Sequence, residues 1–363
     1  MDEYFGCTLE DIRLHGHETY WRDLFSFLES HDYLLRPRYR PGWEPVWPPP
    51  PDNPFASTED YVPLPVYRSY MTDATRISDG KLVMMKAVPA TSAELDICRY
   101  FSSEPLRADP RNRCIPLLEV LPHPNDPDVC IMVMPYLRSI DDPSFDTVED
   151  ILECGEQILE GISFMHEHNV AHRDCAYRNI MMDASALYPR GFHPLYTGFL
   201  PDASGLAPKL PRSSAPITYY LMDFGISTRF PPDDPSKLVL GTDGIEDSVP
   251  ELSKTVPYDP FKTDVYIIGA LFCQKFLVKF SNMEMMAPLA ASMTAKDPAA
   301  RPDAAAALEA WRLMRTQTPA RQRRWRPKAR DETLLGSVSR DALMLMRWVV
   351  YPSPPSVGDE DLQ

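Results

Sequence analysis

Hydrophobic side chains recur at helical spacing in three stretches of the chain. The clearest is 148–168, and a second amphipathic pattern covers residues 18–35, where Trp21 and Phe25 lie on the apolar side. Residues 339–350 predict one more apolar helix. We expect the 18–35 helix to dock against the domain that follows it, with partner binding as the alternative. The apolar face of the clearest helix consists of Ile151, Leu152, Ile158, Leu159, Ile162 and Met165.

Shorter apolar runs predict strands. Residues 79–88 combine a tight Asp-Gly turn with an apolar strand that contains one lysine, Lys86. Two further strands are predicted over 114–120 and 129–134, and a short helix is expected at 94–101 between the first strand and these two.

Composition narrows the functional classes. The chain has 363 residues, enough for roughly two domains, and its net charge of −15 argues against a general nucleic-acid binder. Its seven cysteines form no Cys-x-x-Cys pair, which argues against a zinc site or a disulfide framework. We find no signal peptide and no apolar run of the ~20 residues that a membrane span needs. We therefore expect an intracellular protein, cytoplasmic or nuclear, with neither membrane nor nucleic acid as a partner.

Two short motifs carry the candidate chemistry. His172-Arg173-Asp174 is followed at the fifth position after the aspartate by Asn179, and Asp223-Phe224-Gly225 comes later. Phosphoryl transfer needs a carboxylate at the attacking hydroxyl, which Asp174 can supply. It also needs oxygen ligands for magnesium, which Asn179 and Asp223 can supply.

These motifs resemble the catalytic loop and the magnesium-binding motif of protein kinases. The resemblance extends over about residues 65–315. Within the family, the chain resembles divergent kinase-like proteins found in fungi. It implies an α+β bilobal fold, with a small β-rich lobe over 61–137 and a larger helical lobe over 138–315. The flanks are then an N-terminal extension with a proline-rich linker over 1–60 and a basic linker with a C-terminal helix over 316–363. ATP, Mg²⁺ and a protein substrate are the implied partners.

The resemblance also assigns roles to individual residues. Asp174 accepts the substrate proton, Asn179 and Asp223 hold magnesium, and Lys86, paired with Glu94, positions the phosphates. The implied nucleotide-binding residues are Lys86, Glu94, the gatekeeper Met134, the hinge Pro135, Tyr136 and Leu137, and Met181. The implied structural residues are His172, Arg173, Phe224, Gly225, Glu251, Asp264 and Arg301, with Glu251 and Arg301 expected to form a buried ion pair.

The chain departs from the family pattern in three places. No Gly-x-Gly-x-x-Gly precedes Lys86, and Met84 stands where the family has alanine against adenine. Residues 184–217, rich in proline, predict a long loop that should bulge from the large lobe as an insertion. Two alternatives to an active protein kinase remain: a pseudokinase that serves as a scaffold, and a small-molecule kinase on a related fold.

The acceptor and the basic tail leave further choices open. Ala176 stands where Ser/Thr kinases usually have lysine, and Arg178 resembles the arginine of the Ala-Ala-Arg-Asn sequence that ends the catalytic loop of tyrosine kinases. In contrast, Gly241-Thr242 resembles the Gly-Thr of Ser/Thr kinases and favours a Ser/Thr acceptor. Residues 321–330 hold six basic side chains around Trp325. They predict either a nuclear-localisation or anion-binding patch or a solvated linker.

Overall fold

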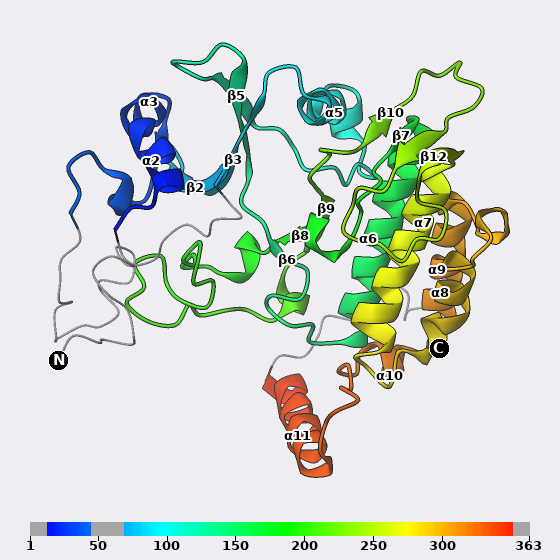
Figure 1. Ribbon diagram of the computed structural model, residues 1–363. Coiled ribbons are helices and arrows are strands. Elements are labelled where there is room, and N and C mark those ends of the chain that lie inside the picture. The colour runs from blue at the N-terminus through cyan, green and yellow to red at the C-terminus, as the bar shows by residue number, and fades with distance from the viewer. Residues whose placement is uncertain (1–12, 45–68, 351–363) are drawn as a thin grey trace. The chain divides into compact units, whose positions relative to one another are not determined.

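The structure, a computed structural model, describes residues 13–44 and 69–350 (Figure 1). It is a mixed α/β protein that divides into two compact units. Unit 1 holds the described parts of 1–109 together with 114–138 and 182–210, and unit 2 holds 110–113, 139–181 and the described remainder from 211 onward. Within the described ranges, no helix combines the length and the apolar character needed to cross a membrane.

Unit 1 is built on a five-stranded antiparallel sheet in the order β1-β2-β3-β5-β4. Side chains alternate between the faces of a strand, so Val83 and Met85 point to one face of β3 while Met84 and Lys86 point to the other. The elements of unit 1 are α2 (Gly16–Asp23), α3 (Phe25–Ser30), β1 (Tyr33–Leu34), β2 (Met71–Arg76), β3 (Leu82–Pro89), α5 (Ala93–Ser102), β4 (Glu119–Pro122) and β5 (Val129–Pro135).

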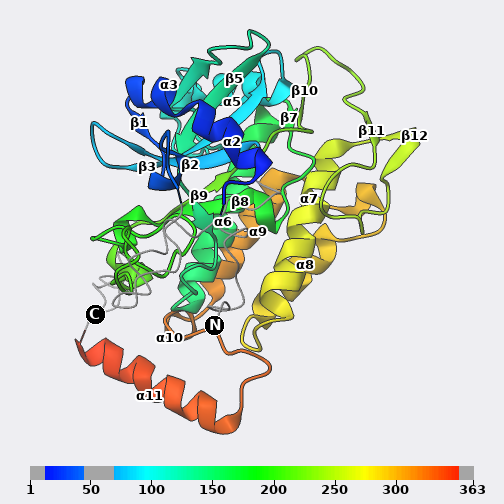
Figure 2. The same ribbon diagram turned by 60° about the vertical axis from the view of Figure 1, so that its left-hand side comes forward.

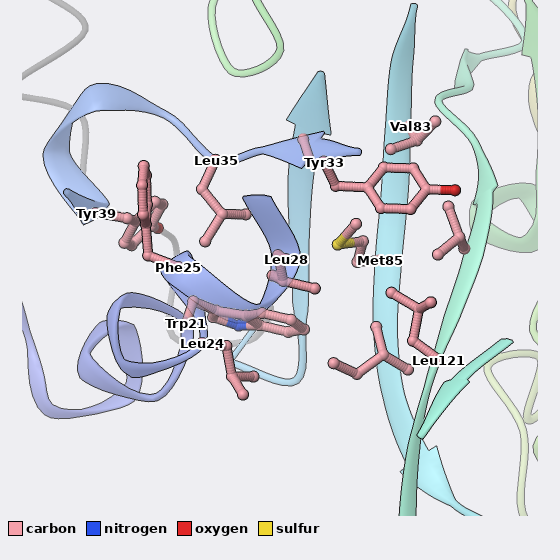
Figure 3. Packing of buried hydrophobic residues seen from close by; sticks show 13 residues of the cluster. Trp21, Leu24, Phe25, Leu28, Tyr33, Leu35, Tyr39, Val83, Met85 and Leu121 are labelled. Carbon is pink, nitrogen blue, oxygen red and sulfur yellow. The ribbon is translucent and has the colours of Figure 1, made fainter. Parts of the chain in front are cut away.

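The N-terminal segment packs on one face of this sheet. Trp21 and Leu28, from α2 and α3, are fully buried in a cluster with Met85 and Leu121 of the sheet (Figure 3). The single helix predicted over 18–35 is wrong in its extent. The helix is interrupted at Leu24, which separates α2 from α3, and α3 ends at His31, before β1. The expectation that this segment docks on the following domain is confirmed.

Buried charges hold the segment in place as well. Glu18 and Arg38, both fully buried, approach within 3.1 Å, and Arg36 lies 3.3 Å from Asp73 of β2. Burial lowers the pKa of Arg38, while the charge of Glu18 opposes that shift. Removing one member of such a pair leaves the other charge buried without compensation, so the segment and the sheet depend on each other.

The first two strands of the sheet are far apart in sequence. β1 pairs with β2 through Tyr33 opposite Arg76 and Leu34 opposite Thr75. Residues 35–70 separate these two strands in the sequence. The predicted proline-rich linker at Pro48–Pro51 lies outside the described residues.

Unit 2 is mainly helical, with α6 against α9 and α7 against α8 (Figure 2). Its helices are α6 (Val148–Glu167), α7 (Pro260–Leu271), α8 (Ala287–Met293), α9 (Ala304–Gln317), α10 (Ala320–Arg323) and α11 (Leu334–Val350). The short strands are β6 (Arg138–Ser139), β7 (Val170–Ala171), β8 (Ile180–Asp183), β9 (Thr218–Leu221), β10 (Thr228–Arg229), β11 (Val239–Gly241) and β12 (Ser253–Tyr258). A three-stranded sheet has the order β6-β8-β9, and β7 pairs with β10 and β11 with β12.

The helix predicted over 148–168 is confirmed as α6. Thr147 caps it, accepting a hydrogen bond from Asp150 N at 3.2 Å, while the Asp150 carboxylate accepts one from Thr147 N at 2.8 Å. A Cβ on Gly155 would lie 2.2 Å from the ring of Trp311, so glycine is what lets α9 approach α6 this closely. The Trp311 ring N–H donates to Leu152 O at 2.8 Å and closes the contact.

Three other predictions need correction. The strand expected over 114–120 is found at Glu119–Pro122. The predicted insertion over 184–217 divides between the units, with the part up to Leu210 in unit 1 and the remainder in unit 2. Most basic side chains of 321–330 are paired with carboxylates of this chain, which argues against a free basic patch: Arg323 with Glu149, Arg326 with Glu332 and Asp341, Lys328 with Asp341, and Arg330 with Glu284.

The docking of the N-terminal segment can be tested by matched leucine truncations. Leu28→Ala should lower the free energy of unfolding by about 2–5 kcal/mol, because it leaves a cavity in the cluster under β3. Leu118→Ala, at a 42% exposed position of the same unit, should change it by less than about 0.5 kcal/mol. Urea denaturation followed by circular dichroism measures both. Equal effects of the two substitutions would contradict the docking.

Candidate active site

Asp264 of α7 anchors the loop that contains the first sequence motif. Its buried carboxylate accepts hydrogen bonds from the main-chain N–H of His172 at 2.8 Å and of Arg173 at 2.6 Å. The His166 ring lies 2.9 Å from the same carboxylate. Arg173 adopts a left-handed backbone, with φ at 68°. Such a conformation persists in a non-glycine residue only where its surroundings enforce it, and the two bonds to Asp264 do so.

Asp174 follows directly, and two donors orient its carboxylate. Asn179 donates from Nδ2 to Asp174 Oδ2 at 2.8 Å and to Asp174 O at 2.9 Å. Ile245 N donates to Asp174 Oδ1 at 2.7 Å. A carboxylate has about four lone-pair sites, so each oxygen keeps a site for another donor. Burial raises the pKa of Asp174 above its ordinary value, the bonds from Ile245 and Asn179 oppose the shift, and the charge of Asp223 adds to it.

The second motif lies beside this loop. Met222 N donates to Asn179 O at 2.9 Å, which joins the residue before Asp223 to the end of the first motif. Asp223 has a left-handed backbone with φ at 65°, and Phe224, fully buried, places its ring 5.3 Å from that of His172. Burial lowers the pKa of His172, so this ring is a neutral packed group. Unit 2 therefore brings Asp174, Asn179 and Asp223 together.

These side chains suit a hard cation. Both hydrogen-bonding contacts of the Asn179 amide nitrogen are made to Asp174, so Oδ1 points to the opposite side of the amide. Mg²⁺ is commonly held by one or two carboxylates together with phosphate oxygens and water. In the described part of the chain, no group of three or more His, Cys, Asp or Glu side chains could hold a metal by itself. The two expected ligands, the Asn179 amide oxygen and the Asp223 carboxylate, fit magnesium that takes its further ligands from phosphate and water.

A second pair of predicted residues, Lys86 and Glu94, lies within unit 1. Lys86 Nζ lies 2.6 Å from Glu94 Oε1, and both side chains are buried. Glu94 is in the first turn of α5, where Ser92 accepts a hydrogen bond from Leu95 N at 3.3 Å and caps the helix. The predicted ion pair is therefore present.

The gatekeeper and hinge predictions fall on consecutive residues of unit 1, from Met134 to Leu137, whereas Met181 belongs to unit 2. Met84 of β3 is directly opposite Met134 at the end of β5, which Pro135 ends. Tyr136 and Leu137 follow, and Tyr136 N donates to Leu82 O at 3.4 Å. Met181 lies in β8.

The segment after Gly225 is tied to Arg173. The guanidinium donates to Ile226 O and to Leu240 O, each at 3.0 Å. The segment also contains β10, which pairs with β7, and β11, which pairs with β12. The sequence prediction missed the role of Ile245 N, although Gly244, with φ at 128°, marks the turn that places it. The sequence feature that could have indicated this turn is a glycine inside an acidic segment.

The predicted ion pair between Glu251 and Arg301 is also present. Arg301 donates from Nη1 to Glu251 Oε1 at 2.6 Å and from Nη2 to Oε2 at 2.8 Å, a bidentate pair with the guanidinium fully buried. Thr263 donates to the same carboxylate at 3.0 Å, and the ring of Tyr266 lies 4.7 Å from the guanidinium carbon. The pair joins the end of the segment to Arg301, which lies just before α9, and Thr263 of α7 holds the same carboxylate.

Comparison with known proteins adds no family to this picture. No family model matches the chain, and a search of curated proteins finds no match. The function must therefore be inferred from the residues and their geometry.

The buried pair can be tested by removing its cation. Arg301→Met should lower the free energy of unfolding by about 3–5 kcal/mol, because Glu251 then stays buried without its counter-charge. Adding Glu251→Gln should restore part of that loss. Arg312→Met, which breaks a half-exposed pair with Glu156, should cost less than about 1 kcal/mol. Chemical denaturation measures all four proteins, and an Arg301 effect no larger than the Arg312 effect would contradict a buried pair.

Proposed function

We propose that the chain is a protein kinase with a bilobal kinase-like fold that uses ATP and Mg²⁺. One observation carries the proposal: Asn179 holds the carboxylate of Asp174 with its side chain and receives Met222 N, next to Asp223, with its main chain. Two motifs that are 44 or more positions apart in sequence are thus joined, and together they would supply the base and the two magnesium ligands that phosphoryl transfer requires. The Lys86–Glu94 pair is the support from unit 1.

Each residue then has a defined task. Asp174 accepts a hydrogen bond from the acceptor hydroxyl and takes its proton as the hydroxyl oxygen bonds to the γ-phosphorus of ATP. The bond from that phosphorus to the β-phosphate oxygen breaks in the same transfer, and ADP leaves. Asn179 and Ile245 hold the Asp174 carboxylate in one orientation. Magnesium, held by Asn179 and Asp223, would neutralise charge on the phosphates. Lys86, kept in place by Glu94, would bind the phosphate oxygens of ATP.

The acceptor is proposed to be a protein hydroxyl, serine or threonine rather than tyrosine. The segment between Asp223 and Glu251 is ordered by Arg173 and by two short strand pairs, and it ends at the bidentate Arg301 pair. Such a supported segment next to Asp174 offers a platform for a polypeptide, which a small metabolite does not need. The Gly241-Thr242 sequence favours the Ser/Thr class.

A scaffold without catalytic activity is the second candidate. No Gly-x-Gly-x-x-Gly precedes Lys86 in the sequence, so the chain lacks the glycines that usually let the backbone approach the phosphates. Met84, opposite Met134, also narrows the space for adenine. The complete set of Lys86, Asp174, Asn179 and Asp223 favours the enzyme.

Nucleotide binding is tested first by thermal unfolding with and without Mg²⁺ and ATP. At 100 times Kd, ATP should stabilise the wild type by about 2.7 kcal/mol. Asp223→Asn should lose this magnesium-dependent stabilisation, and asparagine is chosen because it tolerates the left-handed backbone. Asp233→Ala, at an exposed carboxylate of the same segment, is the control and should keep it. A folded wild type that shows no shift at millimolar ATP would favour the scaffold.

Catalysis is tested separately. Asp174→Ala should lower kcat about 10²- to 10⁴-fold, the usual contribution of a general base. Transfer of labelled phosphate from ATP to a mixed protein substrate measures it, with Asp233→Ala again as the matched control. Turnover by Asp174→Ala equal to that of the wild type would sink the assignment of the base. Labelling of metabolites without labelling of proteins would point to a small-molecule kinase.

A further inference from the structure

The inserted loop, residues 184–210, is an ordered element of unit 1. His193 is fully buried, and its Nδ1 accepts hydrogen bonds from Leu195 N at 3.1 Å and Tyr196 N at 3.0 Å. Its own main-chain N–H donates to Phe199 O at 2.8 Å. A short antiparallel bridge pairs Phe199 with Leu206, and Leu210 N closes the base of the loop on Leu187 O at 2.8 Å. These hydrogen bonds hold the loop in one conformation, so residues that contact it are restrained as well.

One point of attachment is the side chain of Tyr136. Its hydroxyl donates a short hydrogen bond to Pro194 O, and its ring lies 5.7 Å from the ring of Phe192. Tyr136 is the middle residue of the predicted hinge, between Pro135 and Leu137. The loop thus holds the hinge through a side chain and leaves the main-chain groups of Pro135 and Leu137 out of this contact.

The second attachment is Arg138, just after the hinge. Its guanidinium lies 4.4 Å from the centre of the Tyr188 ring and 4.5 Å from that of Phe192. It also donates from Nη1 to Thr197 O at 2.8 Å, and the residue is only 3% exposed. A planar guanidinium against two aromatic faces is a geometrically demanding contact that lysine cannot reproduce. Phe192 takes part in both attachments.

We propose that the inserted loop is a brace that sets the hinge and thereby determines the preference for adenine over guanine nucleotides. The inference rests on the proposed function, because it takes Pro135–Leu137 as the segment that recognises the base. Adenine and guanine differ in the donors and acceptors on the edge that a backbone hinge contacts. A hinge held in one position discriminates between them, whereas a hinge that can shift accommodates both. Phosphate binding through magnesium does not depend on this position.

The experiment compares three ligands on three variants. Isothermal titration measures Kd for Mg-ATP, Mg-GTP and Mg-tripolyphosphate, which has no base. Tyr136→Phe removes only the hydroxyl, Phe192→Leu keeps apolar volume but removes the ring beside Arg138, and Tyr196→Phe is the matched control at a 43% exposed tyrosine of the same loop. The ratio of GTP to ATP Kd should fall about 2- to 10-fold in Tyr136→Phe, as expected for one lost hydrogen bond, and further in Phe192→Leu. It should not change in Tyr196→Phe.

The tripolyphosphate Kd distinguishes a brace from a merely stabilising contact. In the proposed arrangement it stays at the wild-type value in every variant. Equal weakening of all three ligands, or an unchanged GTP to ATP ratio in both Tyr136→Phe and Phe192→Leu, would overturn the brace while leaving the proposed function intact. A wild type that binds none of the three ligands would overturn the proposed function, and the brace with it.

Discussion

The buried carboxylate of Asp264 is the constraint on which the candidate site depends. A carboxylate in the protein interior requires hydrogen-bond donors, and two of those that Asp264 receives are consecutive main-chain N–H groups, of His172 and Arg173. This fixes the loop backbone at the residue before Asp174 and keeps Arg173 left-handed. Arg173 in turn reaches the carbonyls of Ile226 and Leu240. The Asp264 carboxylate of α7 therefore orders the loop directly and, through Arg173, also orders the segment after Gly225.

Buried ion pairs provide the other fixed points. Glu251 with Arg301 ties the end of the segment to the chain just before α9, and Lys86 with Glu94 ties β3 to α5. Glu18 with Arg38 lies within the N-terminal segment that packs on the sheet. Such pairs add little net stability compared with apolar residues of the same size, but breaking one is costly. They therefore make each local arrangement specific, which suits positions where a catalytic group needs one geometry.

Two segments from distant parts of the sequence add to the sheet of unit 1. Strand β1, from the N-terminal segment, pairs with β2. The loop 184–210 packs its aromatic side chains against Tyr136 and Arg138. The docking of the N-terminal segment was expected from its sequence, whereas the contacts of the loop were not.

Local patterns determined much of this protein in advance. The 3.6-residue period of 148–168 and the apolar run around Lys86 indicated α6 and β3, because burial of a regular element leaves a periodic trace in the sequence. The resemblance to protein kinases implied that Glu251 should meet Arg301 and that Lys86 should meet Glu94, and both pairs are present. The kinase function and the bilobal architecture stay predictions.

Only the tertiary structure decided the rest. Pairing of β1 with β2 joins residues about forty positions apart in sequence, and a two-residue strand has no period to detect. The contact of Ile245 N with Asp174 uses a main-chain group, so no side-chain pattern could reveal it. The position of the inserted loop depends on aromatic packing around Arg138, between residues some fifty positions apart. Such contacts are selected by the packing of the whole unit, and the local sequence carries no record of them.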